Sequence, residues 1–122
     1  MSDLGAFSMS LPVKDLSTSI AFYEKLGFTA AGGGDKWMMM RMGDKVIGLF
    51  EGMFDKPMLT FNPGWSQGAE NLDRFTDIRE IQKALKAQGI QPEPECDPAS
   101  TGPASLVVTD PDGNPILIDQ HR

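Results

Sequence analysis

The chain has 122 residues, of which 40% are hydrophobic and 23% charged, a composition typical of one globular domain. Its formal charge of -6 and the absence of a cluster of basic residues argue against nucleic acid or an anionic membrane as a partner. A single cysteine, Cys96, excludes an internal disulfide and a zinc site built from cysteines. We find no membrane-spanning run and no signal peptide, so we expect a cytoplasmic protein.

The first half of the chain predicts a strand, a helix and a hairpin. Residues 7–13 alternate in character, as a strand does. A helix follows Asp15 and ends at Gly27, because apolar residues recur between them at helical spacing, namely Leu16, Ile20, Tyr23 and Leu26. Residues 37–50 then predict a β-hairpin that turns at Gly43-Asp44.

The second half repeats this order. Residues 58–62 predict a strand, and a helix follows Asp77 and ends at Gly89, with Ile78, Ile81 and Leu85 as its apolar stripe. Residues 104–119 predict the closing hairpin, which turns at Asp110-Pro-Asp-Gly-Asn114. In both halves the glycine lies twelve residues after the aspartate, which indicates a duplication with an offset of 62 residues.

The two copies differ in two segments. The second half carries an extra stretch, residues 63–75, which predicts a loop with at most one helical turn. The alternating Pro92 and Pro94 predict an edge strand. We therefore predict an α+β fold of two βαβββ modules, about residues 5–52 and 57–121, in one domain spanning residues 1–122.

Two motifs carry a resemblance to a known family. Residues 10–28, Ser-Leu-Pro-Val-Lys-Asp-Leu-Ser-Thr-Ser-Ile-Ala-Phe-Tyr-Glu-Lys-Leu-Gly-Phe, resemble the opening module of the vicinal oxygen chelate superfamily. Residues 110–116 resemble its closing hairpin. That superfamily includes glyoxalase I, bleomycin- and fosfomycin-resistance proteins and extradiol dioxygenases. The resemblance implies a curved mixed-sheet cup with outer helices, a homodimer, and a small-molecule ligand in the cup, often with a divalent metal.

Alternation along the strands predicts which side chains face that cup. A two-residue turn pairs Arg41 with Val46, Met39 with Gly48 and Trp37 with Phe50, and paired residues share a face. The predicted ligand-binding residues are Ser8, Ser10, Trp37, Met39, Arg41, Phe50, Leu117, Asp119 and His121. The predicted core is Met9, Leu11, Val13, Ile20, Leu26, Ile47, Leu49, Ile78, Ile81, Leu85, Ile116 and Ile118.

The resemblance also implies where a metal would bind. Its ligand positions correspond to Ser8, Gly48, Leu117 and a residue within 58–62. Glycine and leucine have no donor atom, serine is a poor ligand for these ions, and residues 58–62 contain no His or Glu. We therefore expect no metal and no other cofactor.

Several side chains allow two interpretations. His121 is either a general base beside Asp119 or a solvated terminal residue. Arg41 either clamps an anionic group or extends into solvent from the end of a strand. Trp65 either covers the cup or packs on the domain's own surface. Cys96 is not expected to be a nucleophile, because acidic neighbours raise a thiol pKa.

Two main functions follow. The first is a small-molecule-binding protein of the glyoxalase/bleomycin-resistance type without the family metal, which predicts a flat or aromatic ligand with an anionic or strongly polar end. The alternative is a lyase, isomerase or dioxygenase-like enzyme that uses an atypical or metal-free site. A third interpretation, a protein-interaction module, remains if side chains fill the cup. A shared fold alone does not decide among these functions.

Overall fold

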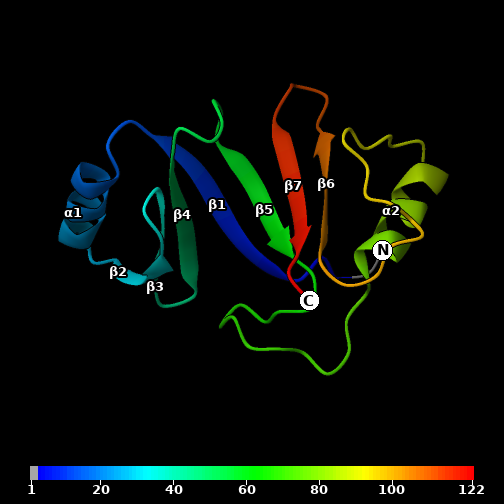
Figure 1. Ribbon diagram of the computed structural model, residues 1–122, viewed down its shortest axis with the longest axis horizontal. Coiled ribbons are helices and arrows are strands. Elements are labelled where there is room, and N and C mark those ends of the chain that lie inside the picture. The colour runs from blue at the N-terminus through cyan, green and yellow to red at the C-terminus, as the bar shows by residue number, and fades with distance from the viewer. Residues whose placement is uncertain (1–2) are drawn as a thin grey trace. The chain divides into compact units, whose positions relative to one another are not determined.

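The structure is a computed structural model that describes residues 3–122. Its elements in chain order are β1 (Ala6–Val13), α1 (Leu16–Leu26), β2 (Thr29–Gly33), β3 (Trp37–Met42), β4 (Lys45–Glu51), β5 (Met58–Asn62), α2 (Ile78–Ala87), β6 (Ala104–Thr109) and β7 (Pro115–Gln120) (Figure 1). The chain forms two compact units: a first unit of residues 8–58, and a second unit of residues 3–7 and 59–122. Each unit combines one helix with parallel and antiparallel strands, so the α+β prediction is confirmed.

The first unit has the strand order β2-β3-β4-β1, with β1 parallel to β4 and the other pairs antiparallel. The hairpin of β3 and β4 has the predicted register, since Trp37 pairs with Phe50 and Arg41 with Val46. Strand β1 continues the same face by placing Ser10 beside Gly48. The predicted assignment of faces therefore holds across this sheet.

Helix α1 covers the opposite face of the first unit. Its core contains the buried residues Leu16, Met40 and Leu49, against which pack Leu11, Val13, Ile20, Tyr23, Phe28, Met38 and Ile47.

Leu26 was predicted in this core, but it is 58% exposed. The reason is the helix end. Gly27 adopts a left-handed φ of 113°, and Phe28 donates its backbone N–H to the Tyr23 carbonyl at 3.1 Å. This turn packs the Phe28 ring against Tyr23, with ring centroids 5.7 Å apart, so Phe28 and not Leu26 contributes to the core. Met9, also predicted in the core, is half-buried.

The start of α1 is capped from a distant strand. The Leu16 backbone N–H donates to Glu51 Oε1 at 2.8 Å, while the Asp15 carboxylate accepts hydrogen bonds from the Ser17 and Thr18 hydroxyls. Glu51 Oε2 also lies 2.6 Å from the Lys36 ammonium. The pKa of Glu51 is lowered mainly by the hydrogen bond from Lys36 and next by the one from the Leu16 N–H. Glu51 thus ties the helix to the end of β4.

The second unit has the strand order β5-β7-β6, with β5 parallel to β7 and β6 antiparallel to β7. Helix α2 packs on this sheet through a cluster of buried residues, Ile78, Ile81, Leu85, Cys96, Leu106, Val108 and Ile118. The predicted edge strand at residues 92–94 is wrong, because no strand follows α2 before β6. The segment instead makes two backbone hydrogen bonds with Val107: the Glu93 N–H donates to the Val107 carbonyl, and the Val107 N–H donates to the Pro94 carbonyl. Proline lacks the N–H that a longer ladder requires.

The two helices end in the same way. Gly89 has a left-handed φ of 84°, and Ile90 donates to the Leu85 carbonyl at 2.9 Å, which is the bond that Phe28 makes to Tyr23. Each residue of this second turn lies 62 positions after its counterpart. The helix ends therefore match at the predicted offset.

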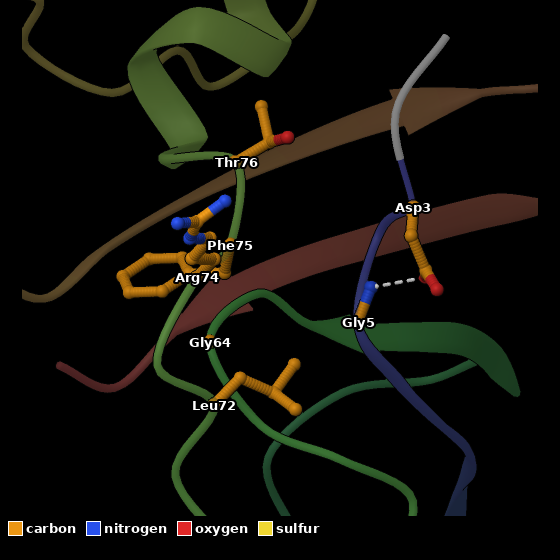
Figure 2. Close-up of a pocket in the computed structure, with 7 residues that line it drawn as sticks. All are labelled: Asp3, Gly5, Gly64, Leu72, Arg74, Phe75 and Thr76. Atoms are coloured by element: carbon orange, nitrogen blue, oxygen red, sulfur yellow. Dashed lines mark hydrogen bonds between the residues drawn. The ribbon is translucent and has the colours of Figure 1, made fainter.

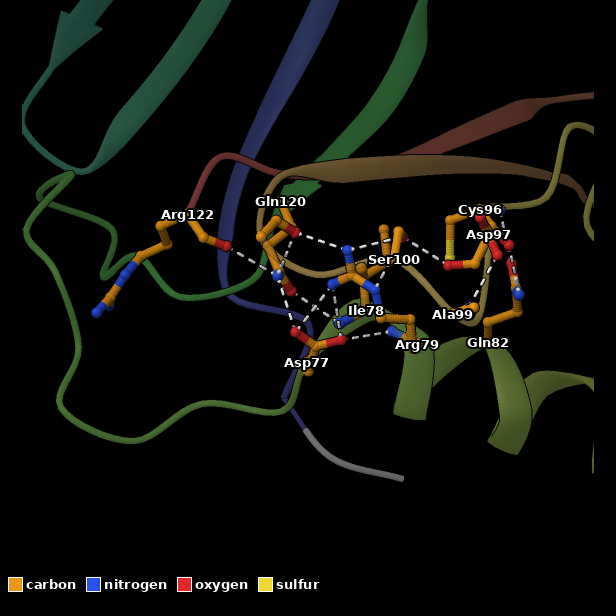
Figure 3. Close-up of polar contacts among 11 residues, drawn as sticks. Asp77, Ile78, Arg79, Gln82, Cys96, Asp97, Ala99, Ser100, Gln120 and Arg122 are labelled. Atoms are coloured by element: carbon orange, nitrogen blue, oxygen red, sulfur yellow. Dashed lines mark hydrogen bonds and ion pairs between the residues drawn. The ribbon is translucent and has the colours of Figure 1, made fainter.

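A buried amide fixes the start of α2 (Figure 3). Gln120, on β7, is 1% exposed and accepts the Ile78 N–H at 2.7 Å. Its Nε2 donates to Asp77 Oδ2 at 3.0 Å and to the Arg122 carbonyl at 2.9 Å. The Asp77 carboxylate accepts from the Arg79 N–H, whereas the Glu80 N–H donates to the Asp77 backbone carbonyl. The side-chain cap therefore reaches the second residue of the helix, and a capping box would require it to reach the third.

Candidate functional site

The nine predicted ligand-binding residues divide between the two units. Six lie in the first unit, namely Ser8, Ser10, Trp37, Met39, Arg41 and Phe50, and three lie in the second, namely Leu117, Asp119 and His121.

No helix in the described part of the chain, residues 3–122, has the length and apolar character needed to span a membrane.

Aromatic rings dominate the sheet face of the first unit. The Trp37 and Phe50 rings are nearly parallel, with an interplanar angle of 10° and centroids 6.4 Å apart. Phe54, which follows the hairpin, extends the row, because its ring centroid lies 5.4 Å from that of Phe50. Trp37 is 37% exposed, although a large aromatic side chain is normally mostly buried. This row is a wall on which a flat apolar molecule can stack.

Gly48 makes the row possible. A Cβ atom at this position would lie 2.5 Å from the Phe50 ring and 3.1 Å from the Met39 sulfur. The ring and the thioether therefore occupy the space that a side chain would need. The resemblance implies a metal ligand at position 48, and here the Phe50 ring takes the space of a side chain at that position.

Arg41 lies apart from the rings. Its Nη1 donates to the Gly43 carbonyl at 3.0 Å, within the hairpin turn. It lies four positions after Trp37 on β3, a distance of about 13 Å along the backbone. A ligand that contacts both side chains must therefore be elongated.

Ser8 and Ser10 are each only 3% exposed. They lie on β1, and Ser10 is next to Gly48 in the sheet. Each serine therefore offers a ligand little accessible surface.

The predicted residues of the second unit form a polar and aromatic group. His121 Nε2 lies 3.1 Å from Asp119 Oδ2, and the imidazole stacks on Trp65 with centroids 4.7 Å apart and an interplanar angle of 4°. Trp65 in turn donates its indole N–H to Asn71 Oδ1 at 3.1 Å. His121 is thus held on both sides, and Trp65 packs on its own unit. A paired imidazole and carboxylate can transfer a proton.

The residues at the positions that the resemblance assigns to metal ligands do not fit a metal centre. Gly48 and Leu117 have no donor atom, and Leu117 lies beside Thr60 in the sheet of the second unit. Among residues 3–122, no group of three or more His, Cys, Asp or Glu side chains is placed to hold a metal ion.

Sequence reasoning missed Phe54 and the stack of Trp65 on His121. Both contacts involve loop residues, and no periodicity in the sequence indicates where a loop side chain packs. The one signal was the spacing of Phe50 and Phe54, which lie either side of the glycine turn that ends β4.

Comparisons with known proteins identify the family. Residues 5–118 match the sequence profile of the Glyoxalase/Bleomycin resistance protein/Dioxygenase superfamily. A bleomycin resistance protein from Klebsiella pneumoniae is 28% identical over 120 residues, covering 93% of this chain and 90% of that protein.

Solved structures share the fold. A superfamily member from Vibrio splendidus superposes with a TM-score of 0.62 at 15% identity, covering 93% of this chain and 97% of that one. A Legionella pneumophila protein described as an NAD-dependent benzaldehyde dehydrogenase gives a TM-score of 0.72 at 16% identity, covering 95% and 99%. The chain belongs to the glyoxalase/bleomycin resistance protein/dioxygenase superfamily.

Proposed function

We propose that the protein binds a flat aromatic small molecule on the Trp37 face of the first unit. The observation that carries the proposal is the row of Trp37, Phe50 and Phe54, in which an indole remains 37% exposed. An exposed and oriented aromatic ring is a common anchor for a planar ligand. The relative from Klebsiella pneumoniae is named for resistance to bleomycin, which supports a drug-binding function over a structural one.

The proposed binding needs no metal. The support is chemical: two of the family's ligand positions are Gly48 and Leu117, and the Phe50 ring covers the first of them. Elemental analysis of the purified protein tests this point. One zinc, nickel, manganese or iron ion per chain, retained through dialysis, would contradict it.

A polar end of the ligand is the second part of the proposal. Arg41 lies on the same face as Trp37, at about 13 Å along the strand. A guanidinium can bind a carboxylate or phosphate through paired hydrogen bonds. We therefore propose an elongated ligand whose planar part stacks at Trp37 and whose anionic or strongly polar end reaches Arg41.

A second candidate function is catalysis in the second unit, of the lyase, isomerase or dioxygenase type. The observation that favours it is the pairing of His121 with Asp119, in which the imidazole also stacks on Trp65. Under this alternative, His121→Gln abolishes turnover of a substrate. Under the binding proposal, the same substitution leaves ligand affinity unchanged.

Calorimetric titration tests the binding proposal. The probes are bleomycin and 8-anilinonaphthalene-1-sulfonate, which are both aromatic but opposite in charge. We expect Trp37→Ala to weaken binding of the preferred probe by about 1–2 kcal/mol, which is about 5- to 30-fold. Trp65→Ala is the matched control, because it removes the other indole of the chain.

Arg41→Ala separates the two parts of the proposal. It should weaken binding of the anionic probe more than binding of bleomycin. Equal affinity of the wild type, Trp37→Ala and Trp65→Ala for both probes would overturn the assignment of the site.

We further propose that the protein is a homodimer that acts in the cytoplasm. The support is its family membership and its composition. Light scattering coupled to size-exclusion chromatography tests the dimer, and a mass equal to one chain at micromolar concentration would contradict it.

A further inference from the structure

A cavity of about 400 Å³ lies in the second unit, and none of the predicted ligand-binding residues lines it. It is lined by Asp3, Gly5, Gly64, Leu72, Arg74, Phe75 and Thr76 (Figure 2). Figure 2 shows the N-terminal segment with Asp3 and Gly5 on one side and the segment with Arg74, Phe75 and Thr76 on the other. Its volume is within the usual range for small-molecule sites, about 300–1,000 Å³.

The cavity is made by the segment that has no counterpart in the first unit. There, β1 ends at Val13 and α1 begins at Leu16, whereas β5 ends at Asn62 and α2 begins at Ile78. The longer connection supplies five of the seven lining residues. The first unit joins β1 to α1 without such a connection, so a strand and the following helix of this fold do not require it.

Hydrogen bonds hold the connection in one shape. Leu72 donates its N–H to the Gly64 carbonyl at 2.9 Å. Arg122 Nη1 donates to the Gly64 carbonyl at 2.9 Å and to the Leu72 carbonyl at 2.6 Å. The Arg122 guanidinium also lies 4.9 Å from the centroid of the Phe75 ring. Gly64, Leu72 and Phe75 are therefore positioned before any ligand arrives.

The opposite wall is fixed as well. Gly5 donates its N–H to the Asp3 carboxylate at 2.8 Å, which sets the direction of that side chain. Gly5 has a φ of 90°, and a Cβ atom there would lie 2.1 Å from the Asn62 carbonyl oxygen. Only glycine lets the N-terminal segment lie this close to the end of β5.

The lining combines both charges with apolar surface. Within residues 3–122, no ion pair or hydrogen bond engages the Arg74 guanidinium, whereas those of Arg79 and Arg122 each bond to carbonyl oxygens. Phe75 is 37% exposed although Arg122 covers part of it. An available cation, an oriented carboxylate and an exposed ring match a molecule that carries both charges and an apolar group.

We propose that this cavity binds a zwitterionic α-amino acid with an apolar side chain. The ligand carboxylate pairs with Arg74 and accepts from the Thr76 hydroxyl, and its ammonium pairs with Asp3. The apolar side chain lies against Leu72 and Phe75. The site is independent of the Trp37 face, so the protein would bind two ligands of different chemistry.

The test is a titration of the ¹⁵N-labelled protein with L-leucine, up to about 10 mM, followed by amide chemical shifts. We expect saturable shifts at Gly5, Gly64 and Thr76. Leucine amide lacks the carboxylate and N-acetyl-leucine lacks the ammonium, so both should bind at least about tenfold more weakly.

Variants at each end of the ligand complete the test. Arg74→Gln and Asp3→Asn should each raise the dissociation constant for L-leucine about tenfold or more. Lys83→Gln and Asp112→Asn are the matched controls, because they remove the same charges at exposed positions outside the cavity. No saturable shift with L-leucine, equal binding of the blocked analogues, or unchanged affinity in Arg74→Gln would each overturn the proposal.

Discussion

Replacing Gln120 with leucine should destabilise the protein by about 2–4 kcal/mol. The substitution keeps the volume of the side chain but removes its polar atoms. The Ile78 N–H, which belongs to a fully buried residue, then loses its acceptor at 2.7 Å, and an unsatisfied buried donor costs about 1–3 kcal/mol. The bonds from Nε2 to Asp77 and to the Arg122 carbonyl are lost in addition. Such a loss is a large part of the total stability of a small domain, about 5–15 kcal/mol.

The same contact predicts a change in pH dependence. Burial raises the pKa of Asp77, but the hydrogen bonds from Gln120 and Arg79 outweigh it, and the pKa lies below its ordinary value. A carboxyl group with a lowered pKa stabilises the fold above its unfolded pKa, and this contribution is lost as the pH falls through the folded pKa. Without Gln120 the lowering is smaller, so Gln120→Leu should lose less stability than the wild type over that acidic range.

Urea denaturation followed by circular dichroism measures both effects. Gln120→Glu is the matched variant, because it keeps an acceptor for the Ile78 N–H but faces Asp77 with a second carboxylate. It should be destabilised at neutral pH and recover part of the loss on acidification, when the new carboxyl group is protonated. If Gln120→Leu unfolds within about 0.5 kcal/mol of the wild type, the amide does not anchor α2 as described.

Three further predictions concern the first unit and the thiol. Gly48→Ala should displace the Phe50 ring and cost about 1–3 kcal/mol, and an unchanged urea midpoint and near-ultraviolet spectrum would speak against the close approach. Glu51→Gln should flatten the loss of stability as the pH falls through the lowered pKa of Glu51, because its bonds to Lys36 and Leu16 favour the charged form; acid titration curves that superpose would contradict this. Burial raises the pKa of the Cys96 thiol, so Ellman's reagent should modify it slowly in the folded protein and rapidly in urea, and equal rates would refute the burial.

Local signals predicted the parts of the fold that depend on neighbouring residues. The hairpin register follows from the Gly43-Asp44 turn, and the helix ends follow from Gly27 and Gly89. Leu26 was misplaced because helical spacing alone does not show that Phe28 folds back onto Tyr23.

Longer-range contacts were not predictable from the sequence. Pro92 and Pro94 alternate as in an edge strand, but the segment makes only two bonds to Val107. Gln120 is a polar residue at the end of a strand, yet it accepts the backbone N–H of Ile78, 42 residues earlier, at the start of α2. Tertiary context decides such contacts.

The same distinction between local signals and longer-range contacts applies to the candidate site. The pairing of Trp37 with Phe50 was predicted because strand register determines which side chains are neighbours. The role of Arg41 stays a prediction, since its guanidinium bonds the Gly43 carbonyl and only a ligand can test its reach. The cavity at Arg74 was not anticipated, because it depends on the path of a loop.

Fluorine NMR of protein labelled with 5-fluorotryptophan tests the central claim most directly. The chain has two tryptophans, so the spectrum contains one resonance for Trp37 and one for Trp65, which Trp37→Phe assigns. On titration with bleomycin or 8-anilinonaphthalene-1-sulfonate, we predict a saturable shift of the Trp37 resonance that exceeds any shift of Trp65. Binding of either probe that leaves the Trp37 resonance unmoved, or no binding of either probe, would contradict a ligand site on the aromatic face of the first unit.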